Sequence, residues 1–334
     1  MNIAIIGAGF SGLAIAWYLL EQARSPLYIT IYDSKGIGAG ASGIAVGLLH
    51  PYAGAHAKLN RMGIEGVEAT KELIDISQKT LQQPVALQKG ILRIAVNEEQ
   101  RLDFLQCANK YSNDIKWLDS AACHTLYPQL VEAPGIWIQN GMIVNSPLYL
   151  MGLWNACQQR GVNLEIRKIN SLKEFKNCDA VILTSGAEII DFPQISSYSL
   201  SIVKGQILEL EWPKRLPPLP FALNSQAYVV MNEDGSKCLA GATFERGYKS
   251  IEPDVDVAKN EILPKVVAMI PALEDAKIVG CYSGLRVVTK NHLPLAERIE
   301  MNTWVLTGMG SKGLLYHALY AKKLAFQILE KKNE

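Results

Sequence analysis

The chain lacks charge at its start, where residues 3–20 contain no Asp, Glu, Lys or Arg. Such a run can be a membrane helix, an export signal or the buried beginning of a nucleotide-binding fold. Only Met1 and Asn2 precede it, so the basic region of an export signal is missing. Three glycines and a serine interrupt its first half, which disfavours a membrane helix of about 20 apolar residues. We therefore expect a strand over 2–6, a turn, a helix over 13–22 and no membrane association.

Cysteine and histidine are also scarce, at six and five residues in 334. The cysteines form no CxxC pair, and Cys123-His124 has no further ligand at metal-site spacing. The pattern predicts reduced thiols in a cytoplasmic protein and no metal site. A net charge of +1 indicates no general attraction to nucleic acid or membranes, although a local basic face stays open.

The turn after the first strand reads Gly7-Ala8-Gly9-Phe10-Ser11-Gly12, which is G-x-G-x-x-G. Gly7 permits a tight turn, Gly9 lets a pyrophosphate approach the backbone, and Gly12 lets helix and strand pack closely. The helix N-terminus then offers N–H groups to the phosphates. A second strand over 27–32 ends at Asp33, 21 residues after Gly12. Its carboxylate can bind ribose hydroxyls and disfavours a 2′-phosphate; a glycine-rich turn without a ligand is the alternative.

Further small-residue turns suit a cofactor that continues past its pyrophosphate, as FAD does. They occupy 36–43, 184–187 after a buried strand, and 308–313 between the last strand and a helix over 314–330. In the last turn, Lys312 could stabilise negative charge on a reduced flavin or be a solvated surface lysine. The residues expected to bind FAD are Gly7, Gly9, Phe10, Ser11, Gly12, Asp33, Ser34, Ala41, Ser42, Gly43, Ser185, Gly186, Gly308, Gly310, Ser311, Lys312 and Gly313.

These four turns resemble the D-amino-acid-oxidase-like family of FAD enzymes over nearly the whole chain. Further segments, such as Lys204-Gly205-Gln206 and 241–244, are similar to the FAD oxidase domain of the bifunctional proteins of tRNA 5-methylaminomethyl-2-thiouridine biosynthesis. The resemblance implies removal of a carboxymethyl group from a modified wobble uridine in tRNA. The methyltransferase half has no room in 334 residues, so we expect a stand-alone oxidase module.

The expected architecture is α/β, with an FAD-binding Rossmann-like domain and an interleaved substrate domain built on an antiparallel sheet. The first comprises residues 1–85, 140–195 and 272–334, and the second 86–139 and 196–271. Strands over 90–96, 203–211, 227–231 and 237–243 are expected in the second, with a hairpin turn at 232–235. Helices are expected over 58–79 and after Asn145-Ser146-Pro147.

Four residues are candidates for the catalytic site, namely Arg286, Lys312, Tyr228 and His50. In related oxidases an arginine in the strand corresponding to that of Arg286 binds the substrate carboxylate, and a planar fork suits that role. Pairing of Arg286 with a structural carboxylate is the alternative, and Tyr228 and His50 can equally be core residues. Some relatives attach FAD through a histidine where this chain has Ile44, so we expect non-covalent FAD.

Three functions remain open: oxidation of modified tRNA, oxidation of a free amino acid or N-methyl amino acid, and a structural or regulatory FAD. Molecular oxygen is the expected electron acceptor in the first two, and the sequence leaves the oligomeric state open. A tRNA enzyme needs cations near its pocket. The candidates for this role are scattered: Lys58, Arg61, Lys89, Arg93 and Arg246.

Overall fold

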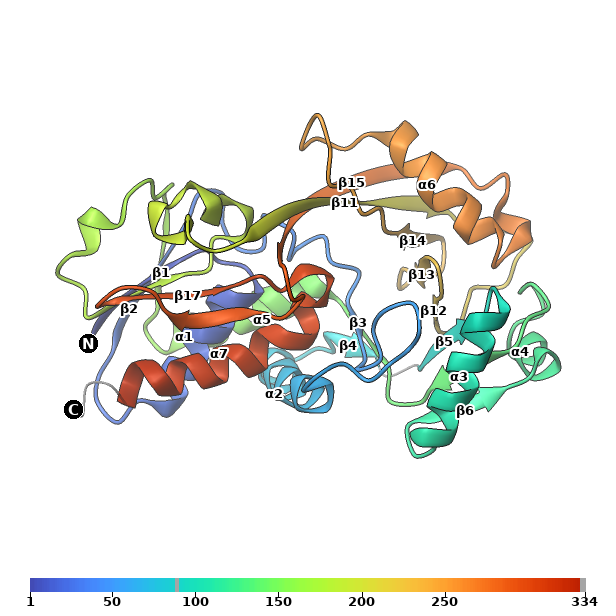
Figure 1. Ribbon diagram of the computed structural model, residues 1–334, viewed down its shortest axis with the longest axis horizontal. Helices are drawn as coiled ribbons and strands as arrows, with labels where there is room; N and C mark the ends of the chain where they lie inside the picture. Colours follow the sequence, from blue (N-terminus) through green and yellow to red (C-terminus); the bar gives the residue numbers. More distant parts are fainter. Residues whose placement is uncertain (88–89, 331–334) are drawn as a thin grey trace.

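A parallel sheet and a larger, mostly antiparallel sheet lie beside each other in the computed structural model, which describes residues 1–87 and 90–330 (Figure 1). The smaller sheet has the strand order β16 (Leu295–Arg298), β17 (Thr303–Thr307), β10 (Ala180–Leu183), β1 (Asn2–Ile6), β2 (Tyr28–Asp33) and β9 (Asn163–Ile166). Only the β16–β17 pair is antiparallel. Strands β10 and β17 are buried throughout, as parallel strands covered on both faces should be.

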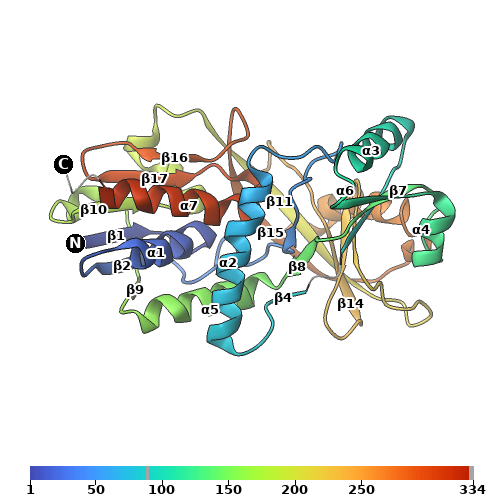
Figure 2. The same ribbon diagram turned by 90° about the horizontal axis from the view of Figure 1, so that it is seen from below.

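Helices α1, α5 and α7 lie along the smaller sheet, and α2 crosses beside them (Figure 2). Their bounds are α1 (Phe10–Gln22), α2 (Gly63–Leu81), α5 (Ser146–Gln159) and α7 (Gly313–Glu330). The expected start of α5 is confirmed, because the Asn145 side chain accepts a hydrogen bond from the Leu148 N–H at 3.2 Å. The structure begins α2 at Gly63, five residues after the expected start.

The larger sheet has the order β15 (Ile278–Thr289), β11 (Leu200–Glu211), β14 (Lys237–Gly241), β13 (Tyr228–Met231), β12 (Ala222–Asn224), β5 (Ile91–Ile94), β7 (Gly135–Ile138) and β6 (Ile115–Leu118). The predicted hairpin joins β13 to β14, which pair antiparallel. Three helices that the sequence analysis did not predict accompany this sheet: α3 (Glu98–Lys110), α4 (Ser120–Leu126) and α6 (Val255–Val267). A small third sheet contains β3 (Leu48–Leu49), β8 (Met142–Val144) and β4 (Ala86–Leu87).

The long strands β11 and β15 pair antiparallel from Leu200–Thr289 to Leu210–Ile278 and reach from the larger sheet toward the smaller one (Figure 1). A bridge between Val288 and Met309 joins β15 to the turn before α7. The two domains and their boundaries stay a prediction; β15 was expected in the nucleotide-binding part and pairs here within the larger sheet. None of the helices in the described residues is long and apolar enough to cross a membrane.

Candidate active site

A cavity of about 920 Å³ lies where the glycine-rich turns of the smaller sheet meet strands β11, β14 and β15. Its volume is at the upper end of the range of about 300–1,000 Å³ that is usual for ligand pockets. The N-terminus of α1, the loop 39–48 and the turns after β10 and β17 line one part. Tyr228, His50 and Arg286 line another. The cavity therefore has room for an extended cofactor together with a small substrate.

Two glycines of the first turn let neighbouring backbone segments approach more closely than a side chain would permit. Gly7 has φ +114°, and a Cβ there would lie 2.4 Å from the carbonyl oxygen of Thr184. A Cβ at Gly12 would lie 1.8 Å from the carbonyl oxygen of Gly7. The role expected for Gly12 in packing is consistent with this contact, and Gly12 itself does not line the cavity.

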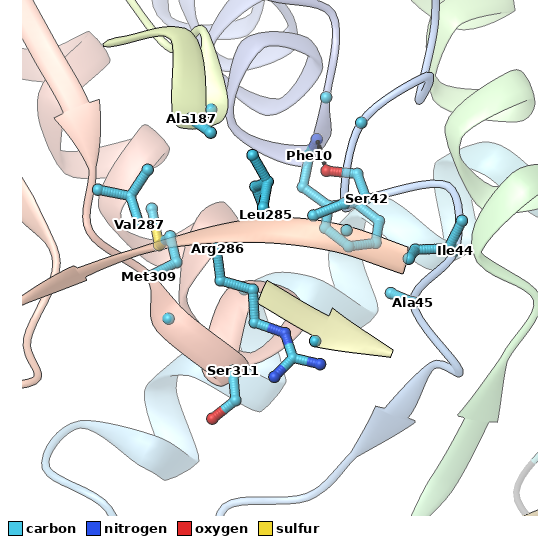
Figure 3. Close-up of a pocket in the computed structure, with 18 of the residues that line it drawn as sticks. Phe10, Ser42, Ile44, Ala45, Ala187, Leu285, Arg286, Val287, Met309 and Ser311 are labelled. Atoms are coloured by element: carbon cyan, nitrogen blue, oxygen red, sulfur yellow. Dashed lines mark hydrogen bonds between the residues drawn. The ribbon is translucent and has the colours of Figure 1, made fainter. Parts of the chain in front are cut away.

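The N-terminus of α1 opens on the cavity through Gly9, Phe10 and Ser11. The N-cap residue, Gly9, supplies no side-chain hydrogen bond, and the first turn contains no acidic residue. The Phe10 N–H donates to Ser42 Oγ at 3.1 Å (Figure 3), which fixes the second small-residue loop against the helix. A helix N-terminus with no N-cap side-chain bond and no acidic residue in its first turn is suited to a phosphate group.

Asp33 lines the same cavity at the end of β2. Its Oδ2 accepts the Ala8 N–H at 2.8 Å, and its Oδ1 accepts the N–H groups of Lys35 and Gly36 at 2.9 and 2.8 Å. These bonds fix the carboxylate between two turns. Because Oδ1 already accepts two N–H groups and Oδ2 accepts only one, Oδ2 retains capacity for a ribose hydroxyl.

Ser185 provides an independent sign that a polar ligand belongs here. Its Oγ is buried, lines the cavity and has no hydrogen-bond partner among the described residues. Buried hydroxyls in native proteins are usually paired, so this atom needs a partner from the cavity side. Together with the N-terminus of α1 and the fixed Asp33, it makes a donor and acceptor set that fits FAD.

Of the seventeen residues expected to bind FAD, all but Gly12, Gly43 and Lys312 line the cavity. Gly43 closes its loop by donating its N–H to the Gly38 carbonyl oxygen at 3.0 Å. The Lys312 ammonium lies 5.9 Å from the centre of the Tyr316 ring, and burial lowers its pKa. The structure thus does not bring Lys312 to the cavity wall with the other candidates.

Arg286 extends from β15 into the cavity, and Leu285 leaves the strand on the opposite side (Figure 3). Burial lowers the pKa of its guanidinium, which the nearby Tyr228 partly opposes. Within residues 1–87 and 90–330, no hydrogen bond or ion pair involves the guanidinium, so the alternative of a structural ion pair finds no partner. A cation that is mostly removed from water and left without a counter-charge is costly unless a ligand supplies one.

Tyr228 and His50 give the neighbouring wall uncharged polar groups. Burial raises the pKa of Tyr228 well above its usual value, so the phenol stays protonated. Burial, with a smaller contribution from Arg93, lowers the pKa of His50 to about 3. The His50 Nε2 lies 3.3 Å from Asn224 Nδ2, while its buried Nδ1 has no partner in the described structure. Because the Asn224 amide is a donor, Nδ1 then carries the proton.

The sequence analysis did not assign a site role to several further residues that line this region. Asn224, Gln226, Gly205 and Gly241 are brought there by β11, β12, β14 and their loops. Lys204-Gly205-Gln206 and Gly241 stood out only as parts of the family resemblance, and the two amides carried no signal at all. Their positions depend on strand pairings between distant segments.

Three comparisons describe what the chain is similar to. Residues 2–327 match a family model described as FAD dependent oxidoreductase. A tRNA 5-methylaminomethyl-2-thiouridine biosynthesis bifunctional protein MnmC from Maricaulis maris is 22% identical over 98% of this chain, which spans 52% of that relative. The solved glycine oxidase of Geobacillus kaustophilus has a TM-score of 0.85 at 21% identity and covers 98% of this chain and 94% of its own. The solved iminodiacetate oxidase of Chelativorans has a TM-score of 0.80 at 20% identity, with 97% and 94% covered.

Proposed function

The chain belongs to the family of FAD-dependent oxidoreductases, and on this premise we propose that it oxidises an amine that carries a CH2–COO⁻ group on its nitrogen. The observation that carries the proposal is the Arg286 guanidinium in the cavity wall, which has no partner among the described residues. A guanidinium fork matches a carboxylate bidentately, and a substrate carboxylate would supply the missing counter-charge.

The chain's own groups would bind and orient such a substrate rather than take part in proton transfer. Arg286 holds the carboxylate, and the protonated Tyr228 beside it can donate a further hydrogen bond. The neutral His50 presents a donor without adding charge near the amine nitrogen. Bound FAD supplies the two-electron acceptor for a hydride from the methylene carbon. The substrate becomes an imine, which water cleaves to an amine and an α-oxo acid.

Two substrate classes carry this group. The family resemblance implies a carboxymethylated wobble uridine in tRNA; a free glycine-type or N-methyl amino acid is the alternative. The bifunctional MnmC relative supports the first, and the glycine and iminodiacetate oxidases, which share the fold, support the second.

Not all of the cations expected to contact a tRNA are exposed in the structure. The interpretation of Arg93 as a phosphate contact is wrong, because its side chain is 1% exposed and donates to three backbone carbonyls. Lys89 lies outside the described residues, whereas Lys58, Arg61 and Arg246 are exposed. The Arg246 guanidinium lies 5.6 Å from the centre of the ring of Phe244, which lines the cavity and is exposed. This pair would suit a nucleobase and a phosphate at the cavity mouth.

Anaerobic bleaching of the flavin absorbance tests the proposal. Sarcosine, iminodiacetate and glycine would be compared with dimethylamine, which lacks a carboxylate, and with carboxymethylated and unmodified tRNA. We expect bleaching only by carboxylated amines and its loss in Arg286→Ala. Equal rates with dimethylamine would exclude the proposed role of Arg286. Arg246→Ala distinguishes the substrates: for a tRNA enzyme it weakens only the tRNA reaction, which also declines steeply with added salt.

A further inference from the structure

Gly205 lies directly beneath the guanidinium of Arg286. A Cβ built on Gly205 would lie 2.2 Å from Nη2, 2.4 Å from Cζ and 2.8 Å from Nη1 of Arg286. All three distances are shorter than any normal van der Waals contact. The guanidinium therefore rests flat on a stretch of β11 that has no side chain.

The strand register explains the contact. Val203 pairs with Arg286 and Gly205 with Gly284 across β11 and β15. Residues two apart on a strand share a face, so Gly205 is the diagonal neighbour of Arg286 on the same face. A long side chain can span such a diagonal, and Arg286 does so because the position is empty.

Backbone conformation does not require the glycine. Gly205 is not among the glycines with positive φ, so alanine could adopt its backbone conformation without strain. It is buried in the middle of β11, where a glycine weakens a strand. The close approach of the guanidinium accounts for the absence of a side chain.

We propose that Gly205 is a positioning residue, which places the Arg286 fork at the height and angle needed to receive the substrate carboxylate. The proposal rests on the proposed function, since it assigns to Arg286 the binding of that carboxylate. In Gly205→Ala the new methyl group displaces the guanidinium from its position over β11 and toward the cavity. Binding through a two-point fork is sensitive to displacements of this size, so affinity for the carboxylate falls.

The test uses the FAD-loaded enzyme and methoxyacetate, an isostere of sarcosine in which an ether oxygen replaces the oxidisable nitrogen. Its Kd is measured by the change it causes in the flavin spectrum. We expect Gly205→Ala to weaken binding about tenfold or more, with normal FAD content and a much smaller change in kcat at saturating sarcosine. Gly247→Ala is the matched control, because a Cβ at Gly247 meets nothing within 4 Å and Gly247 does not line the cavity.

A double variant tests whether Gly205 acts through Arg286. If it does, Gly205→Ala has no further effect on Kd in an Arg286→Ala background. Should Gly205→Ala alone fail to fold, removal of the guanidinium in the double variant is expected to restore folding and FAD binding. Unchanged methoxyacetate binding in Gly205→Ala, additive effects or a double variant that still misfolds would overturn the proposal. Unchanged binding in Arg286→Ala would instead remove the proposed function itself.

Discussion

The buried Arg93 and the half-buried Arg286 should respond in opposite ways to replacement by methionine. Arg93 is 1% exposed, and its Nη1 and Nη2 donate to the carbonyl oxygens of Tyr52 and Gly54, each at 2.7 Å. Its Nε donates to the Asn224 carbonyl oxygen at 3.3 Å. Arg286 has no such bonds in the described structure. Methionine keeps much of the apolar stem of arginine and removes the charge, so it isolates the contribution of the guanidinium.

For Arg93→Met we expect a loss of about 3–5 kcal/mol in the free energy of unfolding. Hydrogen bonds to a charged group contribute about 1.5–3 kcal/mol each, and three carbonyl groups would lose their donor. Their contributions do not add fully, and the methionine recovers part of the packing against Phe104, over which the guanidinium lies at 5.2 Å. The sum still ranks with the largest effects of single substitutions.

For Arg286→Met we expect a free energy of unfolding that is unchanged or higher by about 1 kcal/mol. The substitution breaks no bond and removes a charge whose desolvation is uncompensated without substrate. The same substitution should weaken carboxylate binding by about 10- to 100-fold, because a charge-assisted bidentate contact is lost.

Urea unfolding of both FAD-loaded variants at one fixed FAD concentration measures the two free energies, since bound cofactor contributes to each by mass action. Titration with methoxyacetate measures how far Arg286→Met raises the Kd for this ligand. A loss of more than about 2 kcal/mol in Arg286→Met would show that the guanidinium is a structural group and refute the reasoning. A loss below about 1 kcal/mol in Arg93→Met would refute the assigned bonds.

Three further predictions concern the cofactor turn, pH and the substrate wall. Gly12→Ala should lower FAD content severely, measured by absorbance, because its Cβ would overlap the carbonyl oxygen of Gly7. Burial lowers the pKa of His317 to about 4, below its unfolded value near 6.5, so its contribution to stability is complete above pH 6.5 and is lost as the pH falls toward 4. Between pH 7 and 5, the free energy of unfolding of His317→Gln, measured with urea, should therefore fall by about 2 kcal/mol less than that of the wild type. Equal decreases would contradict this. Tyr228→Phe should raise KM for sarcosine about fivefold to tenfold with an unchanged flavin spectrum, and an unchanged KM would place its hydroxyl outside the substrate contacts.

The nucleotide-binding elements could be predicted from the sequence because their causes are local. Strand β1 and helix α1 follow from an apolar run and glycine spacing that act within twenty residues. Strand β9 and helix α3 were not predicted. The core-facing side of α3 includes the polar Gln100, which weakens its hydrophobic periodicity. Asn97 accepting the N–H of Gln100 at 2.9 Å is a capping signal from which the start of α3 could have been inferred.

The candidate site likewise contains residues that local sequence patterns predict and residues that they do not. Residues of the FAD turns line the cavity nearly as expected, because each turn carries its own small-residue pattern. The difference between Arg93 and Arg286 could not be predicted, since both are single arginines in apolar strands. What distinguishes them is whether the loop at Tyr52–Gly54 comes near enough to offer carbonyl groups. That contact joins segments about forty residues apart, and no local pattern encodes it.

An arginine left without a partner is a means of selecting substrates as well as of binding them. A carboxylated amine gains the attraction of an uncompensated charge, whereas a neutral or cationic amine would leave that charge desolvated in a closed site. Such selectivity arises because the wrong ligand leaves the guanidinium desolvated without a counter-charge. This energetic cost increases as the site excludes water. Gly205 would contribute by letting the guanidinium lie flat on β11, where no carbonyl or carboxylate of the described residues bonds to it. An acidic residue placed beside Arg286 should therefore narrow the difference between sarcosine and dimethylamine, even if the protein becomes more stable.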